Sequence, residues 1–452
     1  MRVVILGGGI AGLAAGWAFQ GAGADTIILE AGPQVGGLAS GFRDRGYTFD
    51  YFSHRLWTRD PEILSRTEEW IGAPLLSRRK VSRILIDGRF FNYPIDLRDL
   101  LAVRGARVGL AALAGYLKAA WDQAGTAPAD AREDFRTVLT ARYGRGLFDT
   151  FFGPYTSKLT GCPVNELSSA LAREAIPPAG LLRQLLDRSL GRAQEWDDLL
   201  YPEAGFMAIP EGMGRALRSA GAQILLSHRA TRLVRQGNRI TMVEAACGAA
   251  RAIFPADLVV STIPVGDLLA GLDPPAEARL VKAASALRTR AMVVVYLGIA
   301  RERVSEDHWI YVPDPAIRFN RLSETTNYSP RMAPPGRTGL CVEIACDAGD
   351  AVWQERDEAH LGRTVRELVG LGLLRSADEV EAHWVKRFRN AYPIYTHGYE
   401  DHLSTVESGL RTIANLRLCG RQGAFWYGST AQGIRQGLDL AGYEPVAMAR
   451  AA

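Results

Sequence analysis

The first thirty residues constrain the fold of this chain more than any other stretch. An apolar run, Val3 to Leu6, passes directly into Gly7-x-Gly9-x-x-Gly12. In a strand–turn–helix unit, the first glycine allows the tight turn, the second lets backbone N–H groups approach a pyrophosphate, and the third lets the helix pack closely on the strand. Glu30 ends a second apolar run at the expected spacing of about twenty residues. The pattern predicts a dinucleotide-binding βαβ unit in which Glu30 binds the ribose hydroxyls.

The segment after Glu30 narrows the choice of dinucleotide. It reads Ala-Gly-Pro-Gln-Val and then reaches the glycine pair Gly36-Gly37. This segment resembles the FAD-binding signature of the superfamily that contains the flavin amine oxidases, the protoporphyrinogen oxidases and the UDP-galactopyranose mutases. The resemblance implies FAD rather than NAD, with the second glycine pair close to the flavin end of the cofactor.

A second match to the same superfamily lies near the C-terminus, in residues 415–437. This segment resembles the closing FAD motif of the superfamily. The resemblance implies that Gly420 and Arg421 approach the pyrophosphate, and that Gly433 and Ile434 present N–H groups of a helix N-terminus to the flavin pyrimidine edge. Such an N-terminus can stabilise an anionic reduced flavin.

The chain length and the order of the segments indicate interleaved domains. A chain of 452 residues exceeds one comfortable core. We predict an α/β fold, α+β overall, in which a Rossmann-like FAD-binding domain is interrupted by a helical insertion and by a substrate domain with an antiparallel sheet. The predicted ranges are 1–96, 201–270 and 404–452 for the three parts of the FAD-binding domain, 97–200 for the mostly helical insertion, and 271–403 for the substrate-binding domain.

Local patterns support parts of this plan. Asp87-Gly88 joins two strand-like runs between residues 81 and 94, which is a strong hairpin signal. Apolar runs at 291–297 and 339–345 predict strands of the antiparallel sheet.

Composition excludes some classes of function. The net charge of +4 comes from 53 basic and 49 acidic residues, a balance that does not favour nucleic acid as a partner. The five cysteines are scattered and form no Cys-x-x-Cys pair, so neither a metal site nor a redox dithiol is indicated.

The sequence also gives an expectation about location. The glycine fingerprint begins at residue 2, and the most apolar helical stretch, residues 100–121, contains Arg104, Arg107 and Lys118. We therefore expect a cytoplasmic protein with no signal peptide and no transmembrane segment. Peripheral membrane contact stays open, because substrates in this superfamily can be lipophilic.

His54 is the first candidate for a catalytic residue. Residues 47–57 resemble the superfamily segment that places a histidine close to the flavin ring. That pattern carries small glycines just before the histidine, whereas Phe52 and Ser53 stand here. The alternative is a buried structural histidine, which is a common role for a single histidine.

Arg290 is the second candidate. Residues 153–161 resemble a segment of the sugar mutases, and Arg290 matches an arginine that grips the nucleotide pyrophosphate in those enzymes. Ser157 replaces a mutase arginine, and Thr160 replaces a mutase tryptophan. Loss of one charge-assisted contact weakens the case for a diphosphate substrate.

These features favour one function and leave alternatives. A single glycine fingerprint indicates that the substrate meets the flavin directly. We predict an FAD-dependent oxidoreductase that transfers a hydride from a small-molecule substrate to flavin N5. The alternatives are a non-redox mutase or isomerase acting on a nucleotide-linked sugar or related glycoside, which would make the substrate anionic or glycosidic, and a protein that binds FAD as a structural ligand only.

Overall fold

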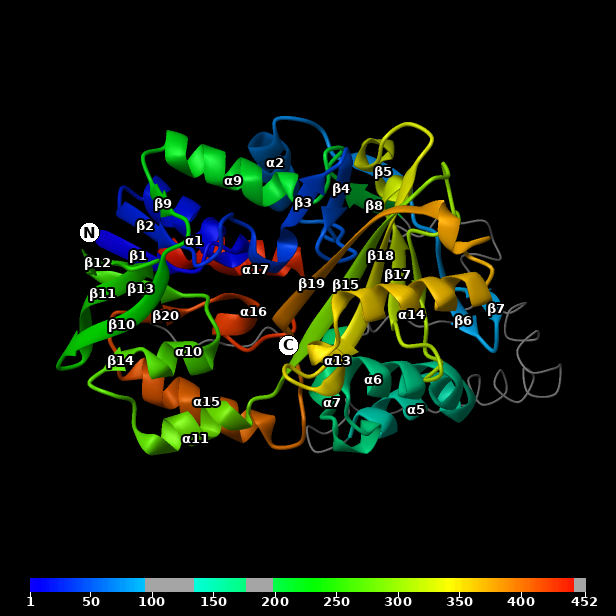
Figure 1. Ribbon diagram of the computed structural model, residues 1–452. Helices are drawn as coiled ribbons and strands as arrows, with labels where there is room; N and C mark the ends of the chain where they lie inside the picture. Colours follow the sequence, from blue (N-terminus) through cyan, green and yellow to red (C-terminus); the bar gives the residue numbers. More distant parts are fainter. Residues whose placement is uncertain (94–133, 176–197, 443–452) are drawn as a thin grey trace.

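The computed structural model describes residues 1–93, 134–175 and 198–442. One half of the molecule contains a five-stranded sheet with the order β20-β13-β1-β2-β9, in which all neighbours are parallel (Figure 1). Its strands come from three parts of the chain: β1 (Arg2–Leu6), β2 (Asp25–Leu29), β9 (Gln223–Leu225), β13 (Leu258–Ser261) and β20 (Leu416–Leu418). Distant segments therefore build one sheet, which confirms the predicted Rossmann-like fold.

Different layers bury the two faces of this parallel sheet. Side chains alternate along a strand, so Val3 and Ile5 face one layer while Val4 and Leu6 face the other. The first layer holds the helices α1 (Ile10–Gly21), α2 (Pro61–Ile71), α9 (Ala208–Ser219) and α17 (Thr430–Asp439). The second holds α10 (Val265–Ala270), α11 (Ala278–Ala286), α15 (Tyr399–Arg411) and a four-stranded sheet of β12 (Ala250–Pro255), β11 (Arg239–Cys247), β10 (Arg229–Gln236) and β14 (Leu272–Asp273).

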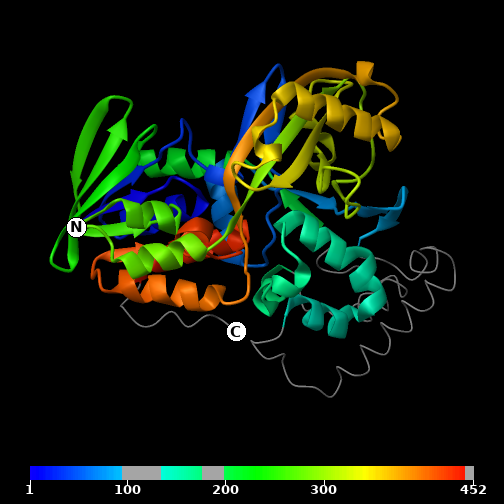
Figure 2. The same cartoon turned by 60° about the horizontal axis from the view of Figure 1, so that its bottom comes forward.

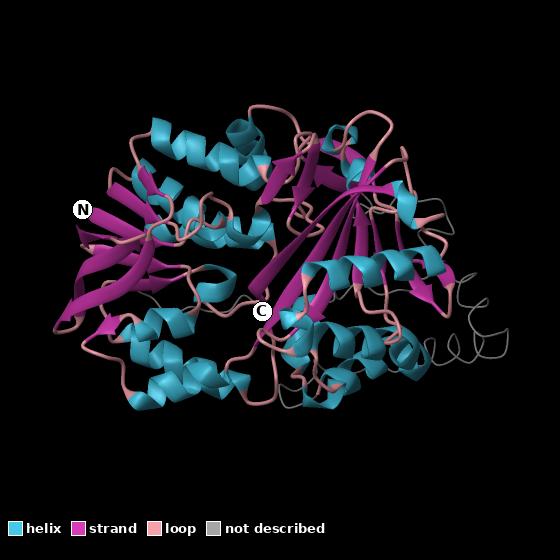
Figure 3. Cartoon of the chain, in the orientation of Figure 1, coloured by secondary structure: helices cyan, strands magenta, loops and turns pink. Residues whose placement is uncertain are grey.

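The other half of the molecule is built on a seven-stranded sheet with the order β19-β15-β18-β17-β16-β6-β7 (Figure 3). Its strands are β6 (Ser82–Ile86), β7 (Arg89–Asn92), β15 (Thr289–Ile299), β16 (Trp309–Tyr311), β17 (Arg321–Glu324), β18 (Thr338–Cys346) and β19 (Val380–Pro393). β15 pairs antiparallel with both β18 and β19, as the sequence predicts. Helix α14 (Asp357–Gly370) covers one face of this sheet, and aromatic residues of β4 (Tyr47–Asp50) and of β3 (Gly41–Asp44) pack on the other.

The predicted hairpin at Asp87-Gly88 forms, but it joins the seven-stranded sheet. Both turn residues have positive φ, 50° and 74°, which matches a turn that favours glycine. The hairpin falls within the range 1–96 predicted for the FAD-binding domain, yet β6 pairs in parallel with β16. Local turn chemistry predicts a hairpin, whereas the sheet that it joins depends on a partner far along the chain.

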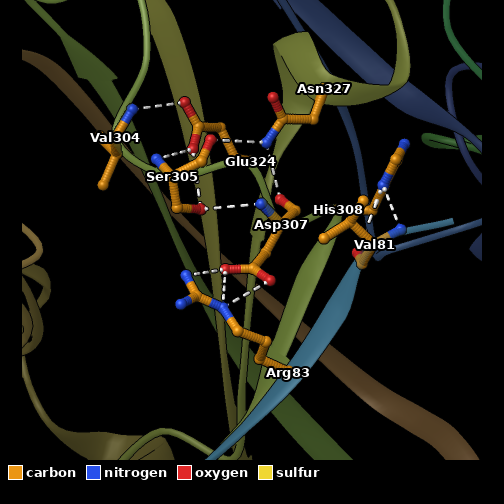
Figure 4. Close-up of polar contacts among 8 residues, drawn as sticks. All are labelled: Val81, Arg83, Val304, Ser305, Asp307, His308, Glu324 and Asn327. Atoms are coloured by element: carbon orange, nitrogen blue, oxygen red, sulfur yellow. Dashed lines mark hydrogen bonds and ion pairs between the residues drawn. The ribbon is translucent and has the colours of Figure 1, made fainter. Parts of the chain in front are cut away.

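A buried polar network fixes this long-range junction (Figure 4). Arg83 on β6 donates from Nε to Oδ2 of Asp307 at 2.8 Å, and the Asp307 side chain is almost fully buried. The N–H of His308 donates to the carbonyl oxygen of Val81 at 2.8 Å. Asn327 donates to the carbonyl oxygens of Ser305 and Asp307. The bonds of Arg83 and Val81 tie β6 to the segment directly before β16, and those of Asn327 hold that segment in place.

The described part of the predicted insertion is helical. It contains α5 (Phe135–Leu147), a π-helical turn (Phe148–Phe152), α6 (Gly153–Thr160) and α7 (Ser169–Ala175), which lie beside the large sheet (Figure 2). Residues 198–200, at the end of the predicted helical range, belong instead to strand β8 (Asp198–Tyr201), which pairs with β5 (Leu76–Arg79). The apolar stretch 100–121 lies outside the described residues. Within the described ranges, no helix is long and apolar enough to cross a membrane.

Candidate functional site

The three glycines of the first turn have different roles: the fold requires Gly7 and Gly12, whereas Gly9 borders open space. Gly7 has φ of 99°, a region that strains other residues, and its N–H donates to the carbonyl oxygen of Leu29 at 2.8 Å. A Cβ on Gly12 would lie 2.0 Å from the carbonyl oxygen of Gly7. A Cβ on Gly9 would meet no protein atom within 4 Å. Gly9 therefore leaves room for a ligand to approach the backbone.

Glu30 lies at the end of β2, beside this turn. Its Oε2 accepts the N–H of Gly8 at 2.7 Å, and its Oε1 accepts the N–H of Gly32 at 2.6 Å. The carboxylate is thus held at the edge of the first turn, where the sequence pattern expects an acid for the ribose.

The second glycine pair lies against the first turn. The N–H of Gly36 donates to the carbonyl oxygen of Gly8 at 2.8 Å, and a Cβ on Gly37 would lie 3.3 Å from the Cα of Gly9. On its other side, a Cβ on Gly36 would lie 2.8 Å from Pro210, at the start of α9. Three segments that are separate in sequence therefore pack tightly together here.

The C-terminal helix α17 brings its N-terminus to the same place. Ser429 and Gln432 form a capping box at its start, which satisfies N–H groups of the first turn. The nearest atom to a Cβ on Gly433 would belong to Ile10 of α1, 4.0 Å away, and Ile434 is fully buried. The N-termini of α1 and α17 therefore lie close together, and both carry partial positive charge.

Gly420 lies at the junction of these two helices. A Cβ there would lie 2.9 Å from the Cβ of Ala11, and its N–H donates to Oε1 of Gln436 at 2.6 Å. The close packing shows why glycine stands at this position.

The Arg421 side chain extends away from this junction. It donates to the carbonyl oxygens of Ala391 at 3.0 Å and Gly428 at 2.9 Å. Its guanidinium carbon lies 5.1 Å from the ring centre of Tyr392 and 5.9 Å from that of Tyr427. The cation therefore lies beside two aromatic rings that line the cavity described below.

The His54 ring packs between the glycine loop and an aromatic cluster. Its Nε2 lies 2.7 Å from the carbonyl oxygen of Leu38, next to the second glycine pair. The ring stacks on Phe206 with centroids 5.0 Å apart, and Phe52 packs edge-on to it. Burial lowers the pKa of His54 to about 4. The imidazole is therefore neutral at neutral pH, and Nε2–H donates to the Leu38 carbonyl.

A cavity of about 170 Å³ lies between the helical part, the end of β19 and the segment before α17. Most of its lining is aromatic or aliphatic: Tyr93, Phe135, Phe151, Phe152, Tyr155, Leu159, Leu171, Tyr311, Tyr392, Pro393, Ile394 and Tyr427. Its polar lining consists of Thr156, Thr160, Arg290, Asn320, Arg321 and Glu343. One lining residue, Tyr427, lies in the sequence between the two parts of the closing glycine motif, Gly420-Arg421 and Gly433-Ile434.

A buried ion pair forms part of the polar wall. Arg321 donates from Nε and Nη2 to the two oxygens of Glu343, at 2.9 and 2.7 Å. Glu343 Oε1 also accepts the N–H of Ser53 at 3.2 Å, next to His54. The pair connects the substrate sheet to the segment that carries the candidate histidine.

Arg290 lines the same cavity, and its charge is already compensated. Its Nη1 donates to Oδ1 of Asp347 at 2.6 Å, and its Nε donates to the carbonyl oxygen of Leu159 at 3.0 Å. The structure therefore brings Arg290 and Arg321 to one cavity, whereas His54 and the glycine turns lie on the side of the parallel sheet.

The geometry fits FAD. The open space beside Gly9, the adjacent Glu30 carboxylate and the two converging helix N-termini match the needs of a dinucleotide with a pyrophosphate. The fold and this site define the class: an FAD-dependent flavoenzyme with an oxidoreductase fold. The chain belongs to the family of flavin-containing amine oxidoreductases, whose model matches residues 10–442.

Individual relatives agree with this assignment. The chain is 26% identical over 422 residues to the phytoene dehydrogenase of Streptomyces griseus, covering 82% of this chain and 80% of the relative. It is 25% identical to a lycopene-forming phytoene desaturase of Pseudescherichia vulneris, covering 75% of each chain. The fold is similar to that of reduced UDP-galactopyranose mutase, with a TM-score of 0.82 and 20% identity over 97% of this chain and 93% of that one. This chain is therefore an FAD-dependent oxidoreductase by family.

Local patterns do not predict how the aromatic lining is assembled. Tyr155 lies in the segment 153–161 and Tyr93 in the hairpin segment, but their contacts with Tyr311 arise only through tertiary packing. The ring centroids of Tyr93 and Tyr311 are 5.2 Å apart. Asn320 and Arg321 also line the cavity, and they belong to a segment, residues 318–330, that is rich in polar and aromatic residues. That composition gives no indication of the Glu343 partner.

Proposed function

We propose that this enzyme oxidises a largely apolar small molecule held in the aromatic cavity. The observation that carries the proposal is the position of the cavity, whose lining runs from the substrate sheet to Tyr427 within the closing glycine motif. FAD, when bound, supplies the hydride-accepting chemistry. The residues of this chain bind the substrate, orient it and exclude water.

The lining supports an apolar substrate. Aromatic and aliphatic side chains dominate it, and such pockets bind ligands mainly by removing apolar surface from water. The two guanidinium groups in the wall, Arg290 and Arg321, are each paired with a carboxylate. The names of the curated relatives, which refer to phytoene, agree with a lipophilic substrate class.

The proposal also assigns the FAD contacts. In it, Glu30 binds the ribose of the cofactor, and the backbone at Gly9 and at the α17 N-terminus borders the cofactor. The N–H groups of Gly7, Gly36 and Gly433 donate to protein carbonyl oxygens, so these glycines shape the site by close packing. The residues assigned to the site are Gly7, Gly9, Gly12, Glu30, Gly36, Gly37, Gly420, Arg421, Gly433 and Ile434. The Arg421 guanidinium is held by the carbonyl oxygens of Ala391 and Gly428, so we assign only the main chain of Arg421 to the cofactor.

One observation favours a second candidate, a redox-neutral mutase. Arg290 lines the cavity as the mutase resemblance requires, and the fold is similar to that of UDP-galactopyranose mutase. Against it, Asp347 already neutralises Arg290, and Ser157 supplies no second cation. We therefore rank the oxidoreductase first.

Anaerobic mixing separates the two candidates. The oxidised holoenzyme is mixed with candidate apolar substrates and with nucleotide sugars, and the visible flavin absorption is followed. An oxidoreductase loses the oxidised-flavin absorption in proportion to the product formed. Product formation from a nucleotide sugar that requires prior reduction of the enzyme and consumes no reductant would contradict the proposal.

A further inference from the structure

Arg321 carries a hydrogen-bond donor that a small molecule in the cavity can reach. Its side chain is 16% exposed, whereas the side chain of its partner Glu343 is 1% exposed. Nε and Nη2 of Arg321 donate to the two oxygens of Glu343. Nη1 makes no hydrogen bond within the described part of the chain, and it is not one of the polar atoms there that are fully buried without a partner. The Nη1 group is therefore accessible and has no protein acceptor.

The strand register places the Arg321 side chain on the cavity side of the seven-stranded sheet. Arg321 lies between Tyr311 of β16 and Glu343 of β18, and all three residues line the cavity. The next residue, Leu322, packs in the cluster under α14 on the opposite face. Successive side chains alternate between the two faces, so Arg321 points away from α14. Its Nη2 also lies 3.4 Å from the hydroxyl oxygen of Tyr392, another lining residue.

The ion pair fixes the direction of the free donor. Two parallel hydrogen bonds hold the planar guanidinium of Arg321 in one orientation. Because the carboxylate binds the edge formed by Nε and Nη2, the third nitrogen, Nη1, lies on the side away from Glu343. Glu343 is itself held by the N–H of Ser53, which donates to its Oε1 at 3.2 Å. The donor is therefore preorganised before any ligand binds.

The charges of the pair determine which ligand group suits this donor. The carboxylate of Glu343 compensates the guanidinium, so an anion would gain little attraction in exchange for its lost hydration. An ammonium group has only donors and would meet another donor. A neutral oxygen accepts the hydrogen bond from the guanidinium and costs less to remove from water than an anion.

We propose that Arg321 is a specificity-determining residue whose Nη1 donates to a neutral oxygen acceptor on the substrate, such as a carbonyl oxygen attached to an apolar body. This inference rests on the proposed function and deepens it, because it separates the substrate of this enzyme from a pure hydrocarbon. The aromatic lining binds the body of the substrate, and Arg321 selects for the oxygen.

The test uses three probes of similar shape. Equilibrium dialysis against the oxidised holoenzyme measures the binding of 4-phenylbutan-2-one, of butylbenzene, in which CH₂ replaces the carbonyl group, and of 3-phenylpropanoate, in which O⁻ replaces the terminal methyl group. A hydrogen bond to a charged donor corresponds to about tenfold to hundredfold in affinity. The quantity compared between proteins is the affinity for the ketone relative to that for butylbenzene.

Arg321→Lys provides the decisive variant. It keeps a cation for Glu343 and removes the Nη1 group. We expect the relative affinity for the ketone to fall by about tenfold or more from its wild-type value, because only the ketone loses a hydrogen bond. Arg318→Lys is the matched control, since Arg318 pairs with Glu355 outside the cavity lining, and it should keep the wild-type value. An unchanged relative affinity in Arg321→Lys, or no binding of the ketone to the wild type, would overturn the proposal.

The carboxylate probe tests the choice of a neutral acceptor in the wild-type enzyme alone. We expect 3-phenylpropanoate to bind more weakly than the ketone, because Glu343 already compensates the guanidinium. Tighter binding of the carboxylate would overturn the assignment to a neutral oxygen.

Two further measurements keep the result interpretable. If Arg321→Lys loses FAD or its native melting transition, the double variant Arg321→Met with Glu343→Leu replaces it and should show the same fall. A shift of the flavin absorption in Arg321→Lys without any probe, together with an unchanged relative affinity, would assign the donor to the cofactor and overturn the proposal. The dialysis involves no turnover, so a failure of the oxidoreductase proposal in the anaerobic bleaching experiment is distinct from a failure of this selectivity.

Discussion

The FAD-binding region and the substrate cavity are built in opposite ways. The first consists mainly of backbone: two glycine turns and the N-termini of α1 and α17, brought together from the two ends of the chain. The second consists of side chains from the helical part, from the strands β15, β16, β17, β18 and β19, and from the segment around Tyr427. The contrast teaches that short motifs encode cofactor binding, whereas substrate recognition depends on which distant segments the fold brings together.

The two regions also differ in their electrostatics. The FAD-binding region presents helix N-termini, which attract an anion. The cavity wall contains two arginines, and each is paired with a carboxylate. A charged ligand therefore suits the first region and a neutral one the second.

The largest expected effect is the loss of FAD binding without loss of the fold. Gly9→Val should abolish FAD binding, because the new side chain would occupy the space that the pyrophosphate needs and would meet no protein atom near its Cβ. Gly9 has φ of −72° and ψ of 176°, which other residues adopt easily, so the fold should persist. FAD content after purification and circular dichroism measure the two outcomes.

The control is Gly21→Ala, where a Cβ also meets no atom within 4 Å. It should keep both fold and FAD. Normal FAD content in Gly9→Val would show that the binding assignment is wrong.

The next effect concerns the cavity. Arg321→Met leaves the buried Glu343 carboxylate without its cation, and such losses destabilise proteins by on the order of 3–5 kcal/mol. The double variant Arg321→Met with Glu343→Leu should recover part of this loss, since it removes both charges. Denaturant unfolding of the two variants measures the difference. A single variant as stable as the wild type would contradict the importance of the pair.

A smaller effect concerns the contribution of His54 to the pH dependence of stability. Burial lowers its pKa to about 4, whereas an imidazole in an unfolded chain titrates near 6.5. The unfolded state binds the proton first, so His54 contributes a fall in the free energy of unfolding as the pH drops from about 6.5 towards 4, on the order of 1–2 kcal/mol between pH 7 and pH 5. His54→Gln should lose this contribution, so the free energy of unfolding of the wild type relative to the variant, measured by urea unfolding, should fall by that amount from pH 7 to pH 5.

The same variant tests the predicted catalytic role of His54. A group that transfers protons contributes roughly a hundredfold or more to rate. A loss of that size in single-turnover flavin reduction would support the catalytic prediction. Unchanged kinetics together with an altered pH dependence of stability would assign His54 a structural role.

The smallest effect concerns Arg290. Because Asp347 already pairs with it, Arg290→Ala should change the affinity for an apolar substrate by less than about 0.5 kcal/mol. Calorimetric titration measures this change. A loss of about 2 kcal/mol or more in affinity for a nucleotide diphosphate would instead favour the mutase candidate.

The sequence predicts one region better than the other for a physical reason. Gly7, Gly12 and Glu30 act through local geometry at fixed spacing, so their pattern is visible without a structure. The pairing of Arg321 with Glu343, and of β6 with β16, depends on contacts between distant segments, which local patterns do not record. The hairpin at Asp87-Gly88 illustrates the difference: the turn follows from two adjacent residues, whereas the sheet that the hairpin joins depends on the distant strand β16.

The central claim is that the substrate reaches the flavin through the aromatic cavity. The most direct test is anaerobic reduction of the bound flavin by substrate in wild type, Leu159→Trp and Leu159→Ala, because Leu159 lines the cavity and a larger side chain there would take up space that the substrate needs. We predict that all three proteins bind FAD and are reduced by dithionite, but that the substrate bleaches only the wild type and Leu159→Ala. Bleaching of Leu159→Trp at the wild-type rate would contradict the account.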